Sequence, residues 1–161
     1  ASLERQALEQ LKSSTGVTAA VVTHEGGGDL MINVLNGTLD IGVGEVQELK
    51  SQLEAGEIRI LATFADRRLS QYPEVPTVDE LGYGVTVRKF RGLAAPQGTP
   101  DEIIAMWEKA AQEVLANPEY KAIYEANNLR PEYLSHAEYV EFMQTFADET
   151  KGFLQASGII Q

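Results

Sequence analysis

Three consecutive glycines stand where a strand is expected to meet a helix, a position suited to anion binding. Gly26-Gly27-Gly28 follows a β-branched, alanine-rich segment and precedes a helical pattern. Backbone N–H groups at a helix N-terminus bind anions without a basic side chain, and open α/β sheets bind ligands at this end of their strands. A turn that only connects a strand to a helix explains the same glycines equally well.

Charged and polar side chains next to such turns are further candidate binding residues. Thr23, His24 and Glu25 directly precede the glycines, and Gly44-Glu45 follows a second predicted strand. A carboxylate at position 45 is suited to pairing with an ammonium group or accepting a hydrogen bond from a neutral molecule. The first turn of a helix also favours an acidic residue through the helix dipole alone, so both interpretations of Glu45 stand.

Phe90 and Arg91 lie in a segment expected to cross between lobes, where they would supply an aromatic wall and a cation or serve only as structural residues. Catalysis has little support. The histidines are His24 and His136, there is no cysteine, and no metal, phosphate-loop or nucleophile-elbow motif occurs. We therefore expect no catalytic residue, metal site or cofactor. The net charge of −11 disfavours nucleic acid and anionic membrane surfaces as partners.

The elements that would position these residues alternate between helix and strand in the first part of the chain. Strands separated by single helices imply right-handed crossovers and a mainly parallel sheet with flanking helices, the α/β class. The pattern predicts helices at 3–12, 30–35 and 44–56, a capping turn at 77–81, and strands at 17–23, 39–43, 58–64 and 85–95.

From Gln97 onward the pattern is helical. Thr99, Pro100 and Glu102 predict a helix start, and Ser135 with Glu138 predicts another. We expect Trp107 and the aromatic residues of the last helix to be buried. The wide apolar faces of these helices need a sheet that this part of the chain does not supply. We therefore expect either a missing N-terminal segment or a second copy of the chain to cover them.

Five stretches together resemble the substrate-binding proteins of tripartite tricarboxylate transporters, the Bug or TctC family. They follow the family's order and span nearly the whole chain, although a triple glycine alone is a weak signal. The stretches are Gly26-Gly27-Gly28, GTLDI at 37–41, AGEIRILA at 55–62, YPEVPTVDELGY at 72–83 and GLAAPQGTP at 92–100. Where this chain has His24 and Glu25, the family commonly has an aromatic residue and a lysine.

The resemblance implies a periplasmic, non-catalytic receptor with a type II periplasmic-binding-protein fold. Its two lobes would close on a small carboxylate and deliver it to the membrane permease subunits of the transporter. Family members are about twice as long, so the chain would be a C-terminal fragment. Residues 1–88 would be most of the second, ligand-binding lobe, 89–96 the crossover, and 97–161 helices of the first lobe.

The ligand would be a di- or tricarboxylate, an aromatic acid or an amino acid, and we expect a fragment alone to bind it weakly or not at all. The expected ligand-binding residues are Thr23, His24, Glu25, Gly26, Gly27, Gly44, Glu45, Phe90 and Arg91. The alternatives are a small α/β enzyme or nucleotide-binding domain, and an oligomerising interaction module. A homodimer through exposed C-terminal helix faces is compatible with the receptor as well.

Overall fold

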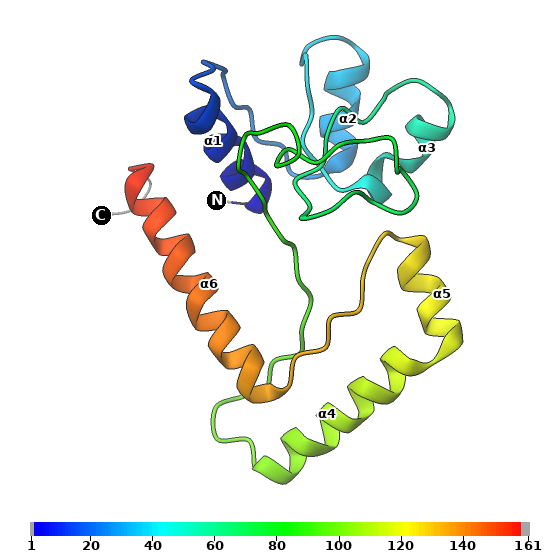
Figure 1. Cartoon of the computed structure of the whole chain (residues 1–161), viewed down its shortest axis with the longest axis vertical. Coiled ribbons are helices and arrows are strands. Elements are labelled where there is room, and N and C mark those ends of the chain that lie inside the picture. The colour runs from blue at the N-terminus through cyan, green and yellow to red at the C-terminus, as the bar shows by residue number, and fades with distance from the viewer. Residues whose placement is uncertain (1, 159–161) are drawn as a thin grey trace. The chain divides into compact units, whose positions relative to one another are not determined.

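A computed structural model describes residues 2–158 of the chain. It divides into two compact units, Ala1–Phe90 (unit 1) and Arg91–Gln161 (unit 2). Figure 1 follows the chain through both units, and each is described by itself below. Within the described residues, no helix is both long and apolar enough to span a membrane.

Unit 1 contains short helices joined by extended segments. They are α1 (Leu3–Thr15), α2 (Gly27–Leu35), the 3-10 helix η1 (Val46–Leu49) and α3 (Lys50–Glu54). The predicted cap of the first helix is confirmed, since the Ser2 hydroxyl accepts a hydrogen bond from the Arg5 N–H at 3.3 Å. Gly37, with φ 77°, follows the α2 C-cap in the left-handed conformation that glycine adopts most readily.

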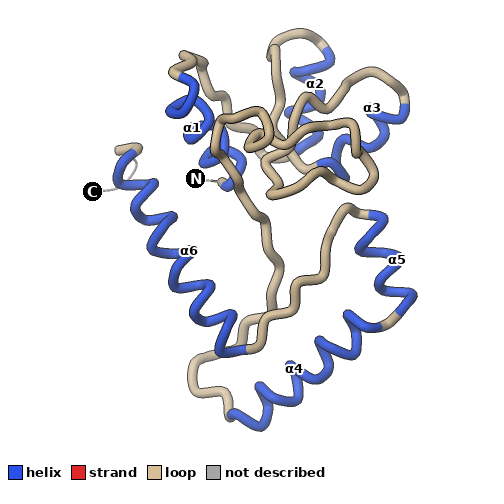
Figure 2. The backbone as a smooth tube through the Cα atoms, in the orientation of Figure 1, coloured by secondary structure: helices blue, strands red, loops and turns tan. Residues whose placement is uncertain are grey.

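The predicted parallel sheet is absent from the part of the chain that the structure describes. Residues 17–24, 39–45 and 58–62 run without ladder pairing, and Figure 2 draws them as loops between helices. A strand is stabilised by hydrogen bonds to a neighbouring strand, and these three described segments share no ladder of backbone hydrogen bonds. Thr63 and Thr77 form an isolated parallel bridge, the one trace of a sheet in residues 2–158.

A small apolar core holds unit 1 together beside that bridge. The buried apolar side chains of the unit are Ala7, Met31, Val75, Val78 and Val85, and Thr77 is buried among the polar residues. The predicted capping box at Thr77 is confirmed. The Thr77 N–H donates to Glu80 Oε2 at 2.9 Å, and the Glu80 N–H donates to Thr77 Oγ1 at 3.1 Å.

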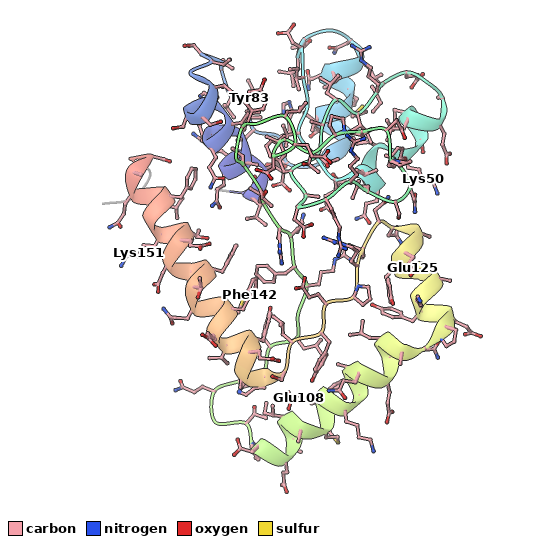
Figure 3. All side chains as sticks on the ribbon, viewed as in Figure 1. Lys50, Tyr83, Glu108, Glu125, Phe142 and Lys151 are labelled. Atoms are coloured by element: carbon pink, nitrogen blue, oxygen red, sulfur yellow. The ribbon has the colours of Figure 1, made fainter. Side chains whose placement is uncertain are left out.

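Unit 2 is made of the helices α4 (Asp101–Ala116), α5 (Pro118–Ala126) and α6 (His136–Ala156). Ser135 and Glu138 form the predicted capping box of α6. Glu108 of α4, labelled in Figure 3, binds to the same end of α6, because its Oε1 accepts from the His136 N–H at 2.6 Å. A carboxylate at a helix N-terminus is favoured by the helix dipole, so this contact joins the two helices.

Two expectations for unit 2 are wrong. The helix α4 begins at Asp101 rather than Pro100, which has an extended ψ of 142°, and the Thr99 hydroxyl donates to the Pro96 carbonyl instead of capping the helix. Trp107 on α4 is 56% exposed rather than buried. The aromatic stripe of α6 is half-buried, with Tyr139, Phe142 and Phe146 in successive stacked pairs.

Candidate functional site

The N-terminus of α2 is built from the predicted glycine turn. Gly26 is the N-cap and has no side chain with which to cap the first N–H groups of the helix. Gly27 is the first helical residue, and the carboxylate of Glu48 in η1 lies against it. A Cβ on Gly27 would be 2.6 Å from Glu48 Oε2, so any larger residue here would make the Glu48 side chain move.

The same carboxylate oxygen connects the two predicted turns. Glu48 Oε2 is 3.9 Å from the position that a Cβ would take on Gly44. The structure therefore brings Gly27 and Gly44 close to the same carboxylate group. Sequence reasoning did not identify Glu48, and the only available signal was an acidic residue three positions after Glu45, close to the second glycine turn.

Glu45 has two partners, one on each carboxylate oxygen. Lys89 Nζ donates to Glu45 Oε1, and Gln47 Nε2 donates to Oε2 at 3.3 Å. Lys89 Nζ also lies 3.5 Å from Oε1 of Glu4, in the first turn of α1. Three segments far apart in the sequence thus meet at one ammonium group, the Lys89 cluster of Glu4, Glu45 and Lys89. No spacing pattern pointed to Lys89, which lies 44 positions from Glu45.

The ionisation of this cluster follows from its hydrogen bonds. The hydrogen bond to Glu45 raises the pKa of Lys89 above its ordinary value, and attraction to Glu4 adds to it. Burial acts to raise the pKa of Glu4, but hydrogen bonds from its own backbone, Ser2 and Lys89 outweigh burial and leave the pKa lowered. Lys89 is therefore a cation at neutral pH.

The residues that precede the glycine turn differ in their surroundings. His24 is half-buried, and its Nε2 lies 3.3 Å from Asn33 Nδ2 on α2. Thr23 and Glu25 are exposed. His24 and Glu45 thus have separate partners, Asn33 and Lys89, rather than sharing the deep pocket that an enzyme would need.

Phe90 and Arg91 stand on either side of the boundary between the two units. Phe90 is half-buried and Arg91 exposed. An open hollow of about 520 Å³ in unit 2 contains none of the predicted site residues. It lies between α4 and α5 and is lined by Ala110, Glu113, Val114, Asn117, Glu119, Tyr120 and Ile123. Over residues 2–158, no three histidine, aspartate or glutamate side chains gather as a metal site would require.

Two curated proteins are similar in sequence to this chain over part of their length. The chain is 26% identical over 152 residues to the "UPF0065 protein in gbd 5'region" of Cupriavidus necator, covering 94% of this chain and 46% of that protein. It is 28% identical over 119 residues to "Protein BugT" of Bordetella pertussis, covering 73% and 36%. The chain thus spans about half or less of the length of these curated relatives.

Solved structures show the same fold. The structure titled "R. palustris Rpa4515 with adipate" superposes with a TM-score of 0.84 at 23% identity, over 98% of this chain and 53% of that one. A TctC solute-binding protein from Polaromonas gives a TM-score of 0.73 at 21% identity, over 93% and 52%. These neighbours establish a fold like that of periplasmic binding proteins.

The match to a family model covers nearly the entire chain. The model described as "Tripartite tricarboxylate transporter family receptor", TctC, matches residues 1–159. The resemblance carried by the five stretches is thereby confirmed, and the chain belongs to the TctC receptor family of tripartite tricarboxylate transporters.

Proposed function

We propose that this chain binds a small organic carboxylate at the N-terminus of α2, as part of an extracytoplasmic receptor that delivers the acid to membrane permease subunits. The observation that carries the proposal is the convergence of Gly27 and Gly44 around the Glu48 carboxylate oxygen. A helix N-terminus whose N-cap has no side chain favours a carboxylate, and in this structure the Glu48 carboxylate lies beside it.

The family supports a binding role rather than catalysis, because TctC proteins are receptors and not enzymes. A structural neighbour was solved with adipate, a dicarboxylate. One of its two carboxylate groups could bind at a helix N-terminus. Aliphatic dicarboxylates are therefore the first ligands to test here. The predicted binding residues are proposed to line the site: Thr23, His24, Glu25, Gly26, Gly27, Gly44, Glu45, Phe90 and Arg91.

Closure of two lobes is the proposed mechanism. A ligand that contacts both lobes stabilises the closed form by its differential affinity for that form. Unit 1 would contribute the α2 N-terminus, one set of those contacts. We expect millimolar rather than micromolar affinity from the 161 residues by themselves, which corresponds to about 4 kcal/mol of binding free energy. The periplasm is the proposed location.

Glu48 provides the test, because its charge would repel a bound carboxylate. In Glu48→Gln the shape is kept and the charge removed, so adipate should bind about fivefold more tightly, which corresponds to about 1 kcal/mol of repulsion across a few ångströms of water. Glu54→Gln is the matched control, with the same change of charge on the exposed C-terminal residue of α3. Titration calorimetry with adipate measures both variants.

The adipate affinities of the two variants distinguish a local carboxylate site from an effect of net charge. Tighter adipate binding by Glu48→Gln and not by Glu54→Gln supports a carboxylate site beside Gly27 and Gly44. Equal effects of the two variants would mean that only the net charge matters and would contradict the proposed location. An absence of adipate, citrate and benzoate binding at millimolar concentration would contradict the proposed function.

A further inference from the structure

The Lys89 cluster changes what the site can recognise. The sequence alone assigned the Glu45 carboxylate to pairing with a ligand ammonium or to accepting a hydrogen bond. In the structure both of its oxygens already have donors, Lys89 Nζ on Oε1 and Gln47 Nε2 on Oε2. The stronger of these donors is itself an ammonium group, and it comes from a distant part of the chain.

Lys89 Nζ contacts the carboxylate that the sequence analysis assigned to a ligand ammonium. The Glu45 side chain is 28% exposed and that of Lys89 51% exposed, so the pair lies at the surface of unit 1, where solutes reach it. Glu4 Oε1, 3.5 Å from the same Nζ, gives Lys89 a second carboxylate. A free amine would have to compete with a tethered cation that already contacts two carboxylates.

We infer that Lys89 is a specificity-determining residue: it satisfies Glu45 from within the chain, so the site prefers carboxylates without an amino group over amino acids of the same length. The inference rests on the proposed function, which it narrows from carboxylates in general to amine-free acids. An ion pair with only a structural role would leave this preference unchanged, since exposed pairs contribute little to stability.

Adipate and 2-aminoadipate form the deciding ligand pair, because they differ by one α-ammonium group. The affinity ratio of the two acids is measured by calorimetry on the full chain and its variants. The unsubstituted chain should prefer adipate. In Lys89→Met, which keeps the length of the side chain and removes the charge, the ratio should move about tenfold toward 2-aminoadipate, since Glu45 is then available for a charge-assisted hydrogen bond.

Three further variants test whether the change in affinity ratio comes from the Lys89–Glu45 pair. Lys50→Met is the control of equal charge, since Lys50 of α3 (labelled in Figure 3) pairs with Glu54 and not with Glu45; its ratio should stay that of the unsubstituted chain. Lys89→Arg retains a cation and should retain the preference for adipate. Adding Glu45→Gln to Lys89→Met should abolish the gain, because the acceptor of the ligand ammonium is lost.

Failure of the inference differs from failure of the proposed function. If the unsubstituted chain binds adipate but Lys89→Met and Lys50→Met show the same affinity ratio, the assignment of Lys89 is overturned and carboxylate binding stands. If Lys89→Met gains 2-aminoadipate binding even when Glu45 is replaced, the assignment is overturned as well. If the unsubstituted chain binds neither acid, the proposed function and the inference built on it both fail.

Discussion

At the scale of single residues, the interactions that sequence reasoning identified are those between near neighbours. Ser2, the Thr77–Glu80 pair and the Ser135–Glu138 pair form the predicted caps, because a cap joins residues three positions apart and needs no tertiary structure. Lys89 and Glu48 were missed, since their contacts with Glu45 and with the glycine turns depend on how distant segments fold together.

The Thr77 capping box predicts an acid-dependent stability. Hydrogen bonds from the Thr77 backbone, and then from the Arg68 side chain, lower the pKa of Glu80. A group with a depressed folded-state pKa stabilises the protein above its unfolded pKa of about 4.3, and this stability is lost as the pH falls through the lower folded value. Glu80→Gln should therefore lower the thermal midpoint at neutral pH, and the difference from the unsubstituted chain should shrink on acidification.

Circular dichroism melts between neutral and acidic pH measure this difference. Glu74→Gln is the control, an exposed glutamate of the same loop that takes no part in the capping box. A gap between Glu80→Gln and the unsubstituted chain that stays constant down to the most acidic melt would show that the Glu80 charge does not act through the cap.

At the scale of elements, the sequence predicted helices well and strands poorly. The helices follow from apolar periodicity and local caps, which act within one segment. A strand also depends on a neighbour, and the extended segments of unit 1 do not pair with one another, apart from the Thr63–Thr77 bridge among the described residues. The resemblance indicated a fold like that of periplasmic binding proteins, which the structural neighbours support, whereas the sheet expected from the α/β pattern is absent from the described residues.

Packing between an extended segment and a helix can be tested at Gly92. A Cβ there would lie 2.5 Å from Cζ of Tyr139, a rigid ring that stacks on Phe142 in α6. Gly92→Ala should therefore destabilise unit 2 by about 1 to 3 kcal/mol, the usual cost of overpacking. Gly152→Ala is the control, because a Cβ on Gly152 of α6 would meet open space. It should stabilise the helix by up to about 1 kcal/mol.

Urea unfolding measures the free energy of unfolding of Gly92→Ala and of Gly152→Ala. The expected pattern is opposite signs, with Gly92→Ala less stable and Gly152→Ala more stable than the unsubstituted chain. If both alanines shifted stability in the same direction, the contact between Gly92 and the Tyr139 ring would not be a determinant of unit 2.

At the scale of the whole molecule, apolar side chains remain uncovered within unit 2. Met106 and Trp107 on α4 are each 56% exposed, and Ile123 on α5 is 59% exposed. Large exposed apolar patches mark interaction surfaces. The sequence attributed the coverage of these faces to a preceding segment or to a second copy of the chain. The homodimer stays a prediction that sedimentation can test.

The molecule is strongly acidic although its proposed ligand is an anion, so binding depends on a local site rather than on the overall charge. A net charge of −11 repels anions at long range, so a carboxylate must be held by short-range donors. We assign this role to the backbone N–H groups at the start of α2, near Gly27 and Gly44. Salt should therefore screen the repulsion more than the contact.

Mapping of the backbone amides shows whether these N–H groups bind the carboxylate. The full chain, labelled with nitrogen-15, is titrated with adipate into the millimolar range, and the backbone N–H signals are followed by nuclear magnetic resonance. The account predicts the largest shifts at Gly26, Gly27, Gly28 and Gly44, saturating together with one dissociation constant. Shifts centred on the hollow between α4 and α5, or no saturable shift at all, would contradict it.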